Sequence, residues 1–369
     1  MYRNTYAQID LDNLNKNVSA IIKRYHNYQY YFGVVKANAY GHGLVKVASE
    51  IIKQGVNYLA VSSLDEALEI RNKMKFVSIL CLEPIALKHI DIAIKNNITL
   101  TISSYDYYKE LITMKLRKGL KVHVKVDSGM NRLGIKDKKE LEEVVNTLLN
   151  HSDILMEGLY THLSNTNSID SSTFDDQINR LLSLTKDIDL NQIQIIHIYN
   201  SSALLNHPKL KMANGVRLGI AMYGINPIKH KEIDITLRPV LSLYSEVMEI
   251  KKVKENEYIG YNEYYQAKRD MLIGIVPIGY ADGVSKKNSG RNVSINGTRY
   301  KIIDGVCMDM LTLYIDENVS IHDSVAIIGE VITVEDIAKY LGTTEYEVLT
   351  AINERVPRLY VKNSKQIFE

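Results

Sequence analysis

Residues 30–53 have the sequence YYFGVVKANAYGHGLVKVASEIIK. The first six residues form an apolar run, which is typical of a strand buried on both faces of a parallel sheet. The last ten residues place apolar side chains at helical spacing. The eight residues between them are mostly small or polar and include two glycines. The stretch therefore predicts one unit of strand, connection and helix.

The same order recurs along roughly the first 230 residues, which is the pattern of an α/β protein. The predicted strands are Tyr30–Val35, Tyr58–Ser62, Val77–Leu82, Ile98–Ile102, Lys121–Val126, Gly158–Thr161, Ile193–Ile198 and Gly215–Leu218. The predicted helices are Leu11–Tyr25, Leu44–Lys53, Ser63–Lys73, Lys88–Asn96, Tyr105–Arg117, Lys138–Leu149, Phe174–Asp187 and Ser201–Asn206. Eight alternations over about 200 residues match a parallel (β/α)8 barrel of the TIM type. An open, doubly wound sheet is the alternative that this pattern leaves open.

A second, mostly β domain is expected after the barrel. Its predicted strands are Val240–Ile250, Met271–Ile278, Arg291–Ile295, Thr298–Ile303, Thr312–Ile315 and Ser324–Ile328. Asn296-Gly297 predicts a tight hairpin, and Thr333 is expected to cap a late helix. We place the barrel at residues 11–233 and the β-rich domain at residues 234–369, with residues 1–10 adding an N-terminal strand to the latter.

The composition argues against several classes of protein. The 45 Lys and Arg residues against 43 Asp and Glu leave a net charge of +2, so broad electrostatic attraction to nucleic acid or to an anionic membrane is not expected. No apolar run approaches the ~18–20 residues of a membrane span, and the first residues lack the apolar centre of a signal peptide. Cys81 and Cys307 have no metal-ligand spacing. We expect a cytoplasmic protein without a metal site.

The connection after the first strand carries a lysine, Lys36. Barrel enzymes place their catalytic groups at the carboxyl ends of the strands. A lysine is unusual there, because desolvating its ammonium is costly unless the lysine takes part in covalent chemistry. After the seventh and eighth strands, Ser201 and Gly219 offer a hydroxyl and a backbone N–H for a phosphate. A lysine with a phosphate site suggests pyridoxal 5'-phosphate held as a Schiff base.

Eight motifs, in order along the chain, resemble those of the bacterial alanine racemases, which are pyridoxal-phosphate enzymes of fold type III. They are VVKANAYGHG at 34–43, KVDSGMNRLG at 125–134, YTH at 160–162, NS at 200–201, VRLGIAMYG at 216–224, PIGYADG at 277–283, CMD at 307–309 and RVPR at 355–358. The resemblance covers essentially the whole chain. It implies a (β/α)8 barrel followed by a β-domain, pyridoxal phosphate as the cofactor, and an amino-acid racemase (an isomerase).

The resemblance also implies a two-base mechanism. Lys36 would hold the cofactor and act as a base on one face of the substrate α-carbon. Racemisation needs a second acid/base on the opposite face, and the matching position is Tyr261. His162 would hydrogen-bond to Tyr261 and lie against the cofactor ring. Arg217 would face the pyridine nitrogen, oriented by His197.

The remaining roles follow from the same resemblance. The cofactor phosphate would contact Tyr40, Ser201, Gly219, Ile220 and Tyr346. The substrate carboxylate would contact Arg132 and the backbone N–H of Met308, and the supporting residues would include Lys125, Asn200, Tyr280 and Asp309. Lys125 is carbamylated in several members of the family, where it holds the arginine at the position of Arg132. Since Tyr261 lies in the β-domain and Lys36 in the barrel, the resemblance implies a homodimer with composite active sites.

Three positions depart from the family pattern. Gly305 stands where arginine is usual, Asn167 where aspartate is common and Asn262 where glycine is common. The first two belong to the family's substrate access corridor, which puts a strict preference for alanine in doubt. Tyr346 points the other way, because its ring leaves little room beyond a methyl side chain. We expect interconversion of L- and D-alanine that supplies D-alanine for peptidoglycan, with a serine or broader-specificity racemase as the alternative.

Two further classes compete with this interpretation. A pyridoxal-phosphate barrel decarboxylase would need an acidic group at the pyridine nitrogen, where the chain has Arg217. A one-domain pyridoxal-phosphate homeostasis protein would share the barrel lysine but would lack a β-domain that carries Tyr261.

Overall fold

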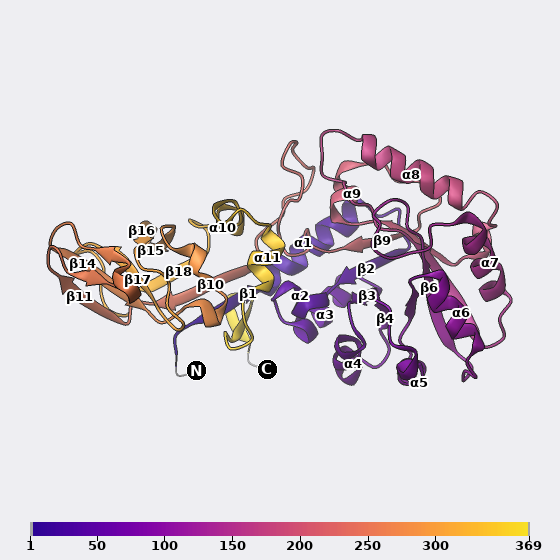
Figure 1. The fold of residues 1–369 in the computed structure, drawn as a ribbon, viewed down its shortest axis with the longest axis horizontal. Helices are drawn as coiled ribbons and strands as arrows, with labels where there is room; N and C mark the ends of the chain where they lie inside the picture. Colours follow the sequence, from indigo (N-terminus) through magenta and orange to yellow (C-terminus); the bar gives the residue numbers. More distant parts are fainter. Residues whose placement is uncertain (1–2, 368–369) are drawn as a thin grey trace. The chain divides into compact units, whose positions relative to one another are not determined.

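The computed structural model describes residues 3–367. The chain divides into two compact units, coloured along the sequence in Figure 1. The barrel unit comprises Leu14–Ala39 and Leu44–Arg238. The β-unit comprises the described residues before Leu14, the short segment Tyr40–Gly43, and the described residues from Pro239 onward.

The barrel unit is built on eight parallel strands. These are β2 (Tyr30–Val34), β3 (Tyr58–Val61), β4 (Ser78–Cys81), β5 (Leu100–Ile102), β6 (Leu120–Lys125), β7 (Ile154–Tyr160), β8 (Ile195–Tyr199) and β9 (Gly215–Leu218). They lie in the order β4-β3-β2-β9-β8-β7-β6-β5. A parallel bridge between Leu80 and Thr99 closes the ring between β4 and β5. The predicted (β/α)8 barrel is confirmed, and the open doubly wound alternative is wrong.

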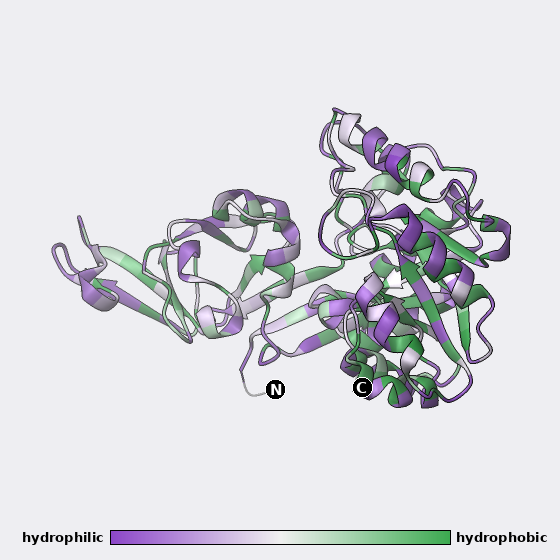
Figure 2. Ribbon diagram, turned by 45° about the vertical axis from the view of Figure 1, so that its right-hand side comes forward, coloured by the Kyte–Doolittle hydropathy of each residue, from purple (hydrophilic) through white to green (hydrophobic). Residues whose placement is uncertain are grey.

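Helical segments connect the strands, and the longer ones cover the outside of the barrel. They are α1 (Leu11–Arg24), α2 (Lys36–Tyr40), α3 (Leu44–Lys53), α4 (Leu64–Lys73), η1 (Leu87–His89), α5 (Ile90–Lys95), α6 (Tyr105–Thr113), α7 (Lys138–Leu149), α8 (Ser172–Leu184), η2 (Leu190–Gln192) and α9 (Ser201–Asn206). Ser63, Ser104 and Asp137 begin α4, α6 and α7 by accepting hydrogen bonds from backbone N–H groups of the first turn, as helix N-caps do. In Figure 2 the barrel strands carry mostly hydrophobic residues, whereas the helices alternate in colour because one face of each packs on the strands.

The β-unit contains a ten-stranded sheet. Its strands are β1 (Tyr6–Asp10), β10 (Leu241–Glu246), β11 (Glu249–Val253), β14 (Met271–Val276), β15 (Asn292–Ile295), β16 (Thr298–Ile302), β17 (Leu311–Ile315), β18 (Ser324–Ile328), β19 (Arg358–Lys362) and β20 (Lys365–Ile367). The strand order is β11-β14-β17-β16-β15-β18-β10-β1-β19-β20. The smaller elements are the hairpin β12 (Tyr258–Ile259) and β13 (Tyr265–Gln266), the turns η3 (Tyr261–Glu263), η4 (Tyr280–Asp282) and η5 (Lys286–Asn288), and the helices α10 (Val334–Leu341) and α11 (Glu345–Thr350). The predicted mostly β second domain is confirmed.

Two local predictions in the β-unit are confirmed and one is wrong. Asn296 and Gly297 have φ values of 50° and 82° and join the paired strands β15 and β16, as a two-residue hairpin turn requires. Thr333 caps α10. The single strand predicted at Val240–Ile250 is instead β10 and β11, because β10 pairs with β1 and β18 whereas β11 pairs with β14.

No helix among residues 3–367 is long and apolar enough to cross a membrane.

Candidate active site

Lys36 lies directly after β2, at the carboxyl end of the barrel strands. The four residues that follow, 37–40, have φ values between 51° and 53°, which makes α2 a turn of left-handed helix. This conformation costs roughly 1–2 kcal/mol for each non-glycine residue, so it needs anchors. Glu66 accepts a hydrogen bond from the N–H of Ala37 at 2.6 Å, and Asn38 accepts one from the N–H of Leu44 at 2.8 Å.

Four cationic side chains meet in the barrel unit around His162. Burial, then the charges of Arg132, Arg217 and Lys36, lower the pKa of Lys125 to about 8, although Asp127 acts in the opposite direction. Burial and the same cations lower the pKa of His162 to about 3. Among residues 3–367, no carboxylate lies within 4 Å of the cationic nitrogens of Lys36, Lys125, Arg132 or Arg217. The site therefore carries an excess of positive charge and suits an anionic ligand.

Arg217 is almost fully buried at the end of β9. Its guanidinium donates to Nδ1 of His197 at 2.9 Å and to Nδ1 of His162 at 3.2 Å. It also donates to the backbone oxygen of Thr161 at 2.8 Å. Burial lowers the pKa of Arg217 to about 10, so the guanidinium remains charged at neutral pH. Both imidazoles then accept through Nδ1 and carry their proton on Nε2.

The loop after β6 places Arg132 at the same end of the barrel. Asp127 holds this loop by accepting hydrogen bonds from the N–H groups of Gly129 at 2.9 Å and Asn131 at 3.0 Å. Arg132 itself is exposed. Arg132 is thus the solvent-facing member of the four cationic residues.

The predicted phosphate residues form two groups. In the barrel unit, the hydroxyl of Ser201 accepts a hydrogen bond from the N–H of Gly219 at 2.9 Å, next to Ile220. Asn200 caps α9 by accepting from the N–H of Ala203 at 2.9 Å. In the β-unit, the rings of Tyr40 and Tyr346 lie 5.7 Å apart. Burial raises the pKa of Tyr346 to about 12, so its phenol stays protonated and able to donate.

The predicted β-unit residues Tyr280, Met308 and Asp309 lie on two loops that touch. The N–H groups of Tyr280 and Ala281 donate to the backbone oxygens of Cys307 and Met308, both at 3.0 Å. Asp309 is bound by Arg355 at 2.8 Å. The same Arg355 also reaches the fully buried Asp282 at 3.2 Å, which ties the two loops together a second time.

Gly279 allows this close approach. A methyl group added there would lie 2.3 Å from the backbone oxygen of Cys307 and 2.5 Å from that of Met308. We expect Gly279→Ala to push the Met308 loop away and to raise the KM for substrate more than it lowers kcat. Steady-state kinetics measure this; Gly274→Ala, in β14, is the matched control, because the nearest atom would lie 3.4 Å from its added methyl group, which is ordinary van der Waals contact. An unchanged KM in Gly279→Ala would contradict a role of the Met308 loop in substrate binding.

Tyr261 follows Gly260, whose φ is 81°, and its side chain is 79% exposed. Nearby, the ring of Tyr264 comes within 3.2 Å of the place where a side chain at Gly305 would begin. The space next to Gly305, where the family resemblance implies arginine, is thus partly taken by an aromatic ring. Asn262 adopts a φ of 55° in the same turn, and Asn167 is exposed in the barrel unit.

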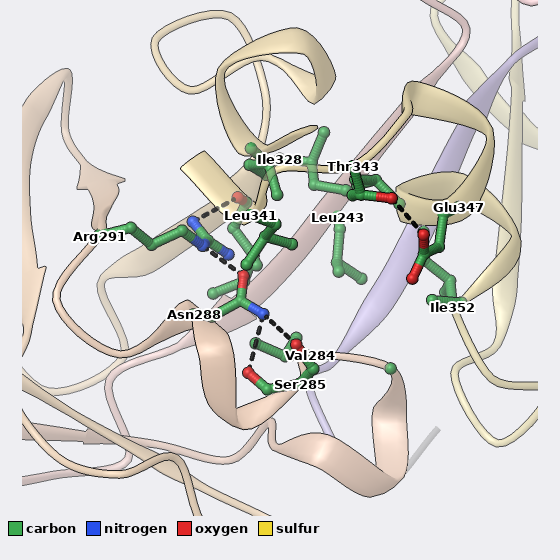
Figure 3. A pocket seen from close by; sticks show the side chains of 15 residues that line it. Leu243, Val284, Ser285, Asn288, Arg291, Ile328, Leu341, Thr343, Glu347 and Ile352 are labelled. Carbon is green, nitrogen blue, oxygen red and sulfur yellow. Dashed lines mark hydrogen bonds between the residues drawn. The ribbon is translucent and has the colours of Figure 1, made fainter. Parts of the chain in front are cut away.

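The β-unit also contains a partly open pocket, whose cavity volume is about 80 Å3 (Figure 3). Mostly apolar side chains line it, together with Arg291, whose Nε donates to Asn288 at 2.6 Å. None of the site residues predicted from the sequence belongs to its described lining. We therefore separate this cavity from the predicted catalytic groups.

Sequence reasoning missed three polar residues, the partly buried Glu66 and the buried His123 and Glu157. Glu66 anchors the turn after Lys36, while His123 and Glu157 lie on β6 and β7 and connect to His197. A signal was available for His123, since this histidine stands between Val122 and Val124 in a strand predicted to be buried. Glu66 gave no such signal, because it lies on an ordinary amphipathic helix.

Comparison with known proteins accounts for nearly the whole chain. Residues 9–227 match the alanine racemase N-terminal domain family and residues 240–360 match the alanine racemase C-terminal domain family. The chain belongs to the alanine racemase family. The resemblance seen in the motifs is confirmed, and so is the predicted class of enzyme, an amino-acid racemase.

Individual relatives of the alanine racemase family agree. The alanine racemase of Anoxybacillus flavithermus is 36% identical, over 100% of this chain and 97% of its own. The crystal structure of alanine racemase from Bacillus anthracis with bound L-Ala-P has a TM-score of 0.93 and 35% identity, covering 100% of this chain and 97% of that one. A histidine racemase from Leuconostoc mesenteroides subsp. sake has a TM-score of 0.88 and 27% identity, covering 98% and 99%. The same fold thus serves more than one amino acid.

Proposed function

We propose that the protein is a pyridoxal-phosphate-dependent racemase that interconverts L- and D-alanine. The observation that carries the proposal is the group of four cations around a neutral His162, without a carboxylate at salt-bridge distance among the described residues. A dianionic cofactor phosphate and a substrate carboxylate are the charges that such a site would balance. The chemistry of the donors therefore fits the cofactor that the family uses.

The residues of the barrel would divide the binding of the cofactor between them. Lys36 would hold it covalently, and Ser201 with the N–H groups near Gly219 would bind its phosphate. Arg217 would face the pyridine nitrogen. When bound, pyridoxal phosphate withdraws electrons from the substrate α-carbon and makes its proton acidic. Because Arg217 keeps its own proton at neutral pH, it would limit this withdrawal, which disfavours decarboxylation.

Two bases would move the proton. Lys36 would serve one face of the α-carbon, and Tyr261 of a second copy of the chain would serve the other. Support for such a homodimer comes from the exposed apolar side chains Tyr261, Tyr264, Met308 and Met310 of the β-unit, since groups of this kind mark interfaces. Arg132 and the N–H of Met308 would bind the substrate carboxylate.

Lys125 is proposed to be carbamylated. Carbon dioxide reacts only with the neutral amine, and a pKa of about 8 makes this form available near neutral pH. We expect a carbamate resonance when the enzyme is equilibrated with 13C-bicarbonate, and its loss in Lys125→Met. Lys209→Met is the matched control, because that lysine lies over the ring of Tyr28, outside the cationic group. A bare ammonium at Lys125 in a crystal grown with bicarbonate would refute the modification.

Serine is the main alternative substrate. The observation that favours a broader specificity is Gly305, beside which the Tyr264 ring lies in place of an arginine side chain. Against it stands Tyr346, whose ring would narrow the substrate site to a methyl group.

The test is a side-by-side assay of L-alanine, L-serine and L-histidine with the purified enzyme, with the visible absorbance of the cofactor followed in the same samples. We expect the highest kcat/KM for alanine. Equal or higher kcat/KM for serine would establish the alternative, and the lack of any cofactor absorbance would overturn the proposal. By its family, the product D-alanine would be used for peptidoglycan, and the enzyme would act in the cytoplasm.

A further inference from the structure

The guanidinium of Arg217 connects to a carboxylate through two buried histidines. Nη1 of Arg217 and Nδ1 of His197 are 2.9 Å apart. Nε2 of His197 and Nδ1 of His123 are 2.8 Å apart. Nε2 of His123 and Oε2 of Glu157 are 3.1 Å apart. All four side chains are buried, so water does not compete for these hydrogen bonds.

Only one arrangement of protons satisfies every link of this chain. Arginine has no acceptor atom, so Nδ1 of His197 must accept. A neutral His197 then carries its proton on Nε2 and donates it to Nδ1 of His123. His123 in turn donates from Nε2 to Glu157. Each N–H therefore points from Arg217 toward Glu157.

The charges of the two ends support the same direction. Burial raises the pKa of Glu157. Hydrogen bonds from His123 and Tyr58, together with the charge of Lys121, lower this pKa by more than burial raises it, so the pKa of Glu157 lies below its ordinary value. Burial lowers the pKa of His197 well below its usual range, and that of His123 as well. Both imidazoles are neutral, which leaves Glu157 as an anion and Arg217 as a cation.

The packing fixes the two rings as well as their protons. The ring of His197 is stacked between Phe32, at 4.4 Å, and Tyr160, at 4.6 Å. The ring of His123 occupies space that Gly158 leaves open, because a methyl group added at Gly158 would lie 2.7 Å from Nδ1 of His123. The two rings are therefore held in place by their neighbours.

We propose that Glu157 is the counter-charge of Arg217, and that His123 and His197 are positioning residues that transmit it across the barrel interior. Arg217 needs such a partner, because no carboxylate among the described residues lies within salt-bridge distance of it. The effect of these hydrogen bonds on catalysis rests on the proposed function of Arg217 at the cofactor. Their effect on the position of the His197 proton does not.

Other charged groups face the two ends and enter the expected pH dependence. Toward Arg217 lie Lys125 of β6, and Tyr160 and His162 of β7 and the loop after it. Lys36, after β2, acts on the same His162. Toward Glu157 lie Lys121 of β6, at 3.8 Å, and Tyr58 of β3, at 2.6 Å. Since Lys121 is partly exposed, its charge is screened more than that of the buried guanidinium.

The experiment compares the holoenzyme with three variants. Glu157→Gln removes the charge but keeps an oxygen that can accept from His123, whereas Glu157→Leu removes both. Gly158→Ala displaces the His123 ring without removing any polar atom. Glu50→Gln is the matched control, because Glu50 is another buried glutamate of the barrel unit that does not contact the chain. Thermal unfolding identifies variants that fail to fold. If either Gly158→Ala or Glu157→Gln fails to fold, the other still tests the proposal.

Two readouts decide the outcome. Nitrogen NMR of 15N-histidine-labelled protein is expected to show His197 protonated at Nε2 only. A proton on Nδ1 would refute the proposed direction of the hydrogen bonds from Arg217 to Glu157. In Glu157→Gln, loss of the counter-charge lowers the pKa of Arg217, so the alkaline limb of kcat and of the cofactor absorbance is expected to move down by on the order of one pH unit. An unmoved limb would overturn the role of Glu157 as the counter-charge.

The two variants that break the series of hydrogen bonds, Glu157→Leu and Gly158→Ala, are expected to have a lower kcat with little change in KM. The loss in Glu157→Leu and Gly158→Ala should be about 10–100-fold, as when the outer partner of a functional histidine is removed. Activity equal to that of Glu50→Gln in both variants would overturn the positioning role. If the wild-type enzyme shows the expected His197 signal but neither binds pyridoxal phosphate nor racemises alanine, the proposed function fails while the proton assignment stands.

Discussion

Lys36→Ala is expected to lower the rate of alanine racemisation by more than about 10^4-fold, because it removes both the covalent anchor of the cofactor and one of the two bases. Formation of D-alanine from L-alanine measures the loss, and the visible absorbance of the protein-bound cofactor should change with it. The fold should be preserved, since Lys36 is only partly buried and follows the last residues of β2.

Lys36→Arg separates covalent chemistry from charge. An arginine keeps the positive charge of the cationic group but does not give up its proton at working pH. We expect it to be as inactive as Lys36→Ala. If Lys36→Arg retained substantial activity, Lys36 would serve only as a charge, and the proposed mechanism would be wrong.

Tyr261→Phe is expected to lower racemisation by about 10^2–10^4-fold, the usual contribution of one acid/base group. L- and D-alanine have the same free energy, so kcat/KM must fall equally in both directions. The two faces are distinguished by exchange of the α-hydrogen with deuterated water. If Tyr261 serves the L-enantiomer, the variant should lose exchange from L-alanine and keep exchange from D-alanine through Lys36.

Tyr264→Phe provides the matched control for this change. Both tyrosines lie in or next to the same short turn and both are exposed, Tyr261 by 79% and Tyr264 by 57%. Loss of a hydroxyl at Tyr264 should leave the exchange of both enantiomers in place. Equal losses in the two variants would mean that the turn, rather than the phenol of Tyr261, is what the reaction needs.

The barrel could be predicted from the sequence because its strands are buried on both faces. Such strands appear as short continuous apolar runs, and every predicted run overlaps one of the strands β2–β9. Helix ends were harder to predict. The predicted helix Tyr105–Arg117 ends at Thr113, and the predicted helix Lys88–Asn96 is a 3-10 turn followed by the short α5. Amphipathic spacing continues past a helix end and therefore does not locate it.

Parts of the site could not be predicted from spacing alone. The left-handed turn after Lys36 contains two alanines and a tyrosine, residue types that disfavour this conformation, and it depends on Glu66 from a distant helix. The links between Glu157, His123 and His197 join residues that lie 34 and 74 positions apart in sequence, on the successive strands β6, β7 and β8. Only tertiary pairing of the strands reveals such contacts, whereas the motif blocks already contained Lys36 and Arg217, and the family resemblance implied a role for His197.

The junction between β4 and β5 differs from the rest of the barrel, because a single bridge between Leu80 and Thr99 joins the two strands where the other neighbours share longer ladders. Few hydrogen bonds must break to separate β4 from β5, so local opening of the barrel is expected to start at this junction. Amide protons of Cys81 and Thr99 should therefore exchange with solvent sooner than those in the middle of β6 and β7. On heating or in denaturant, β4 and β5 are expected to separate before β6 and β7, which share six residue pairs.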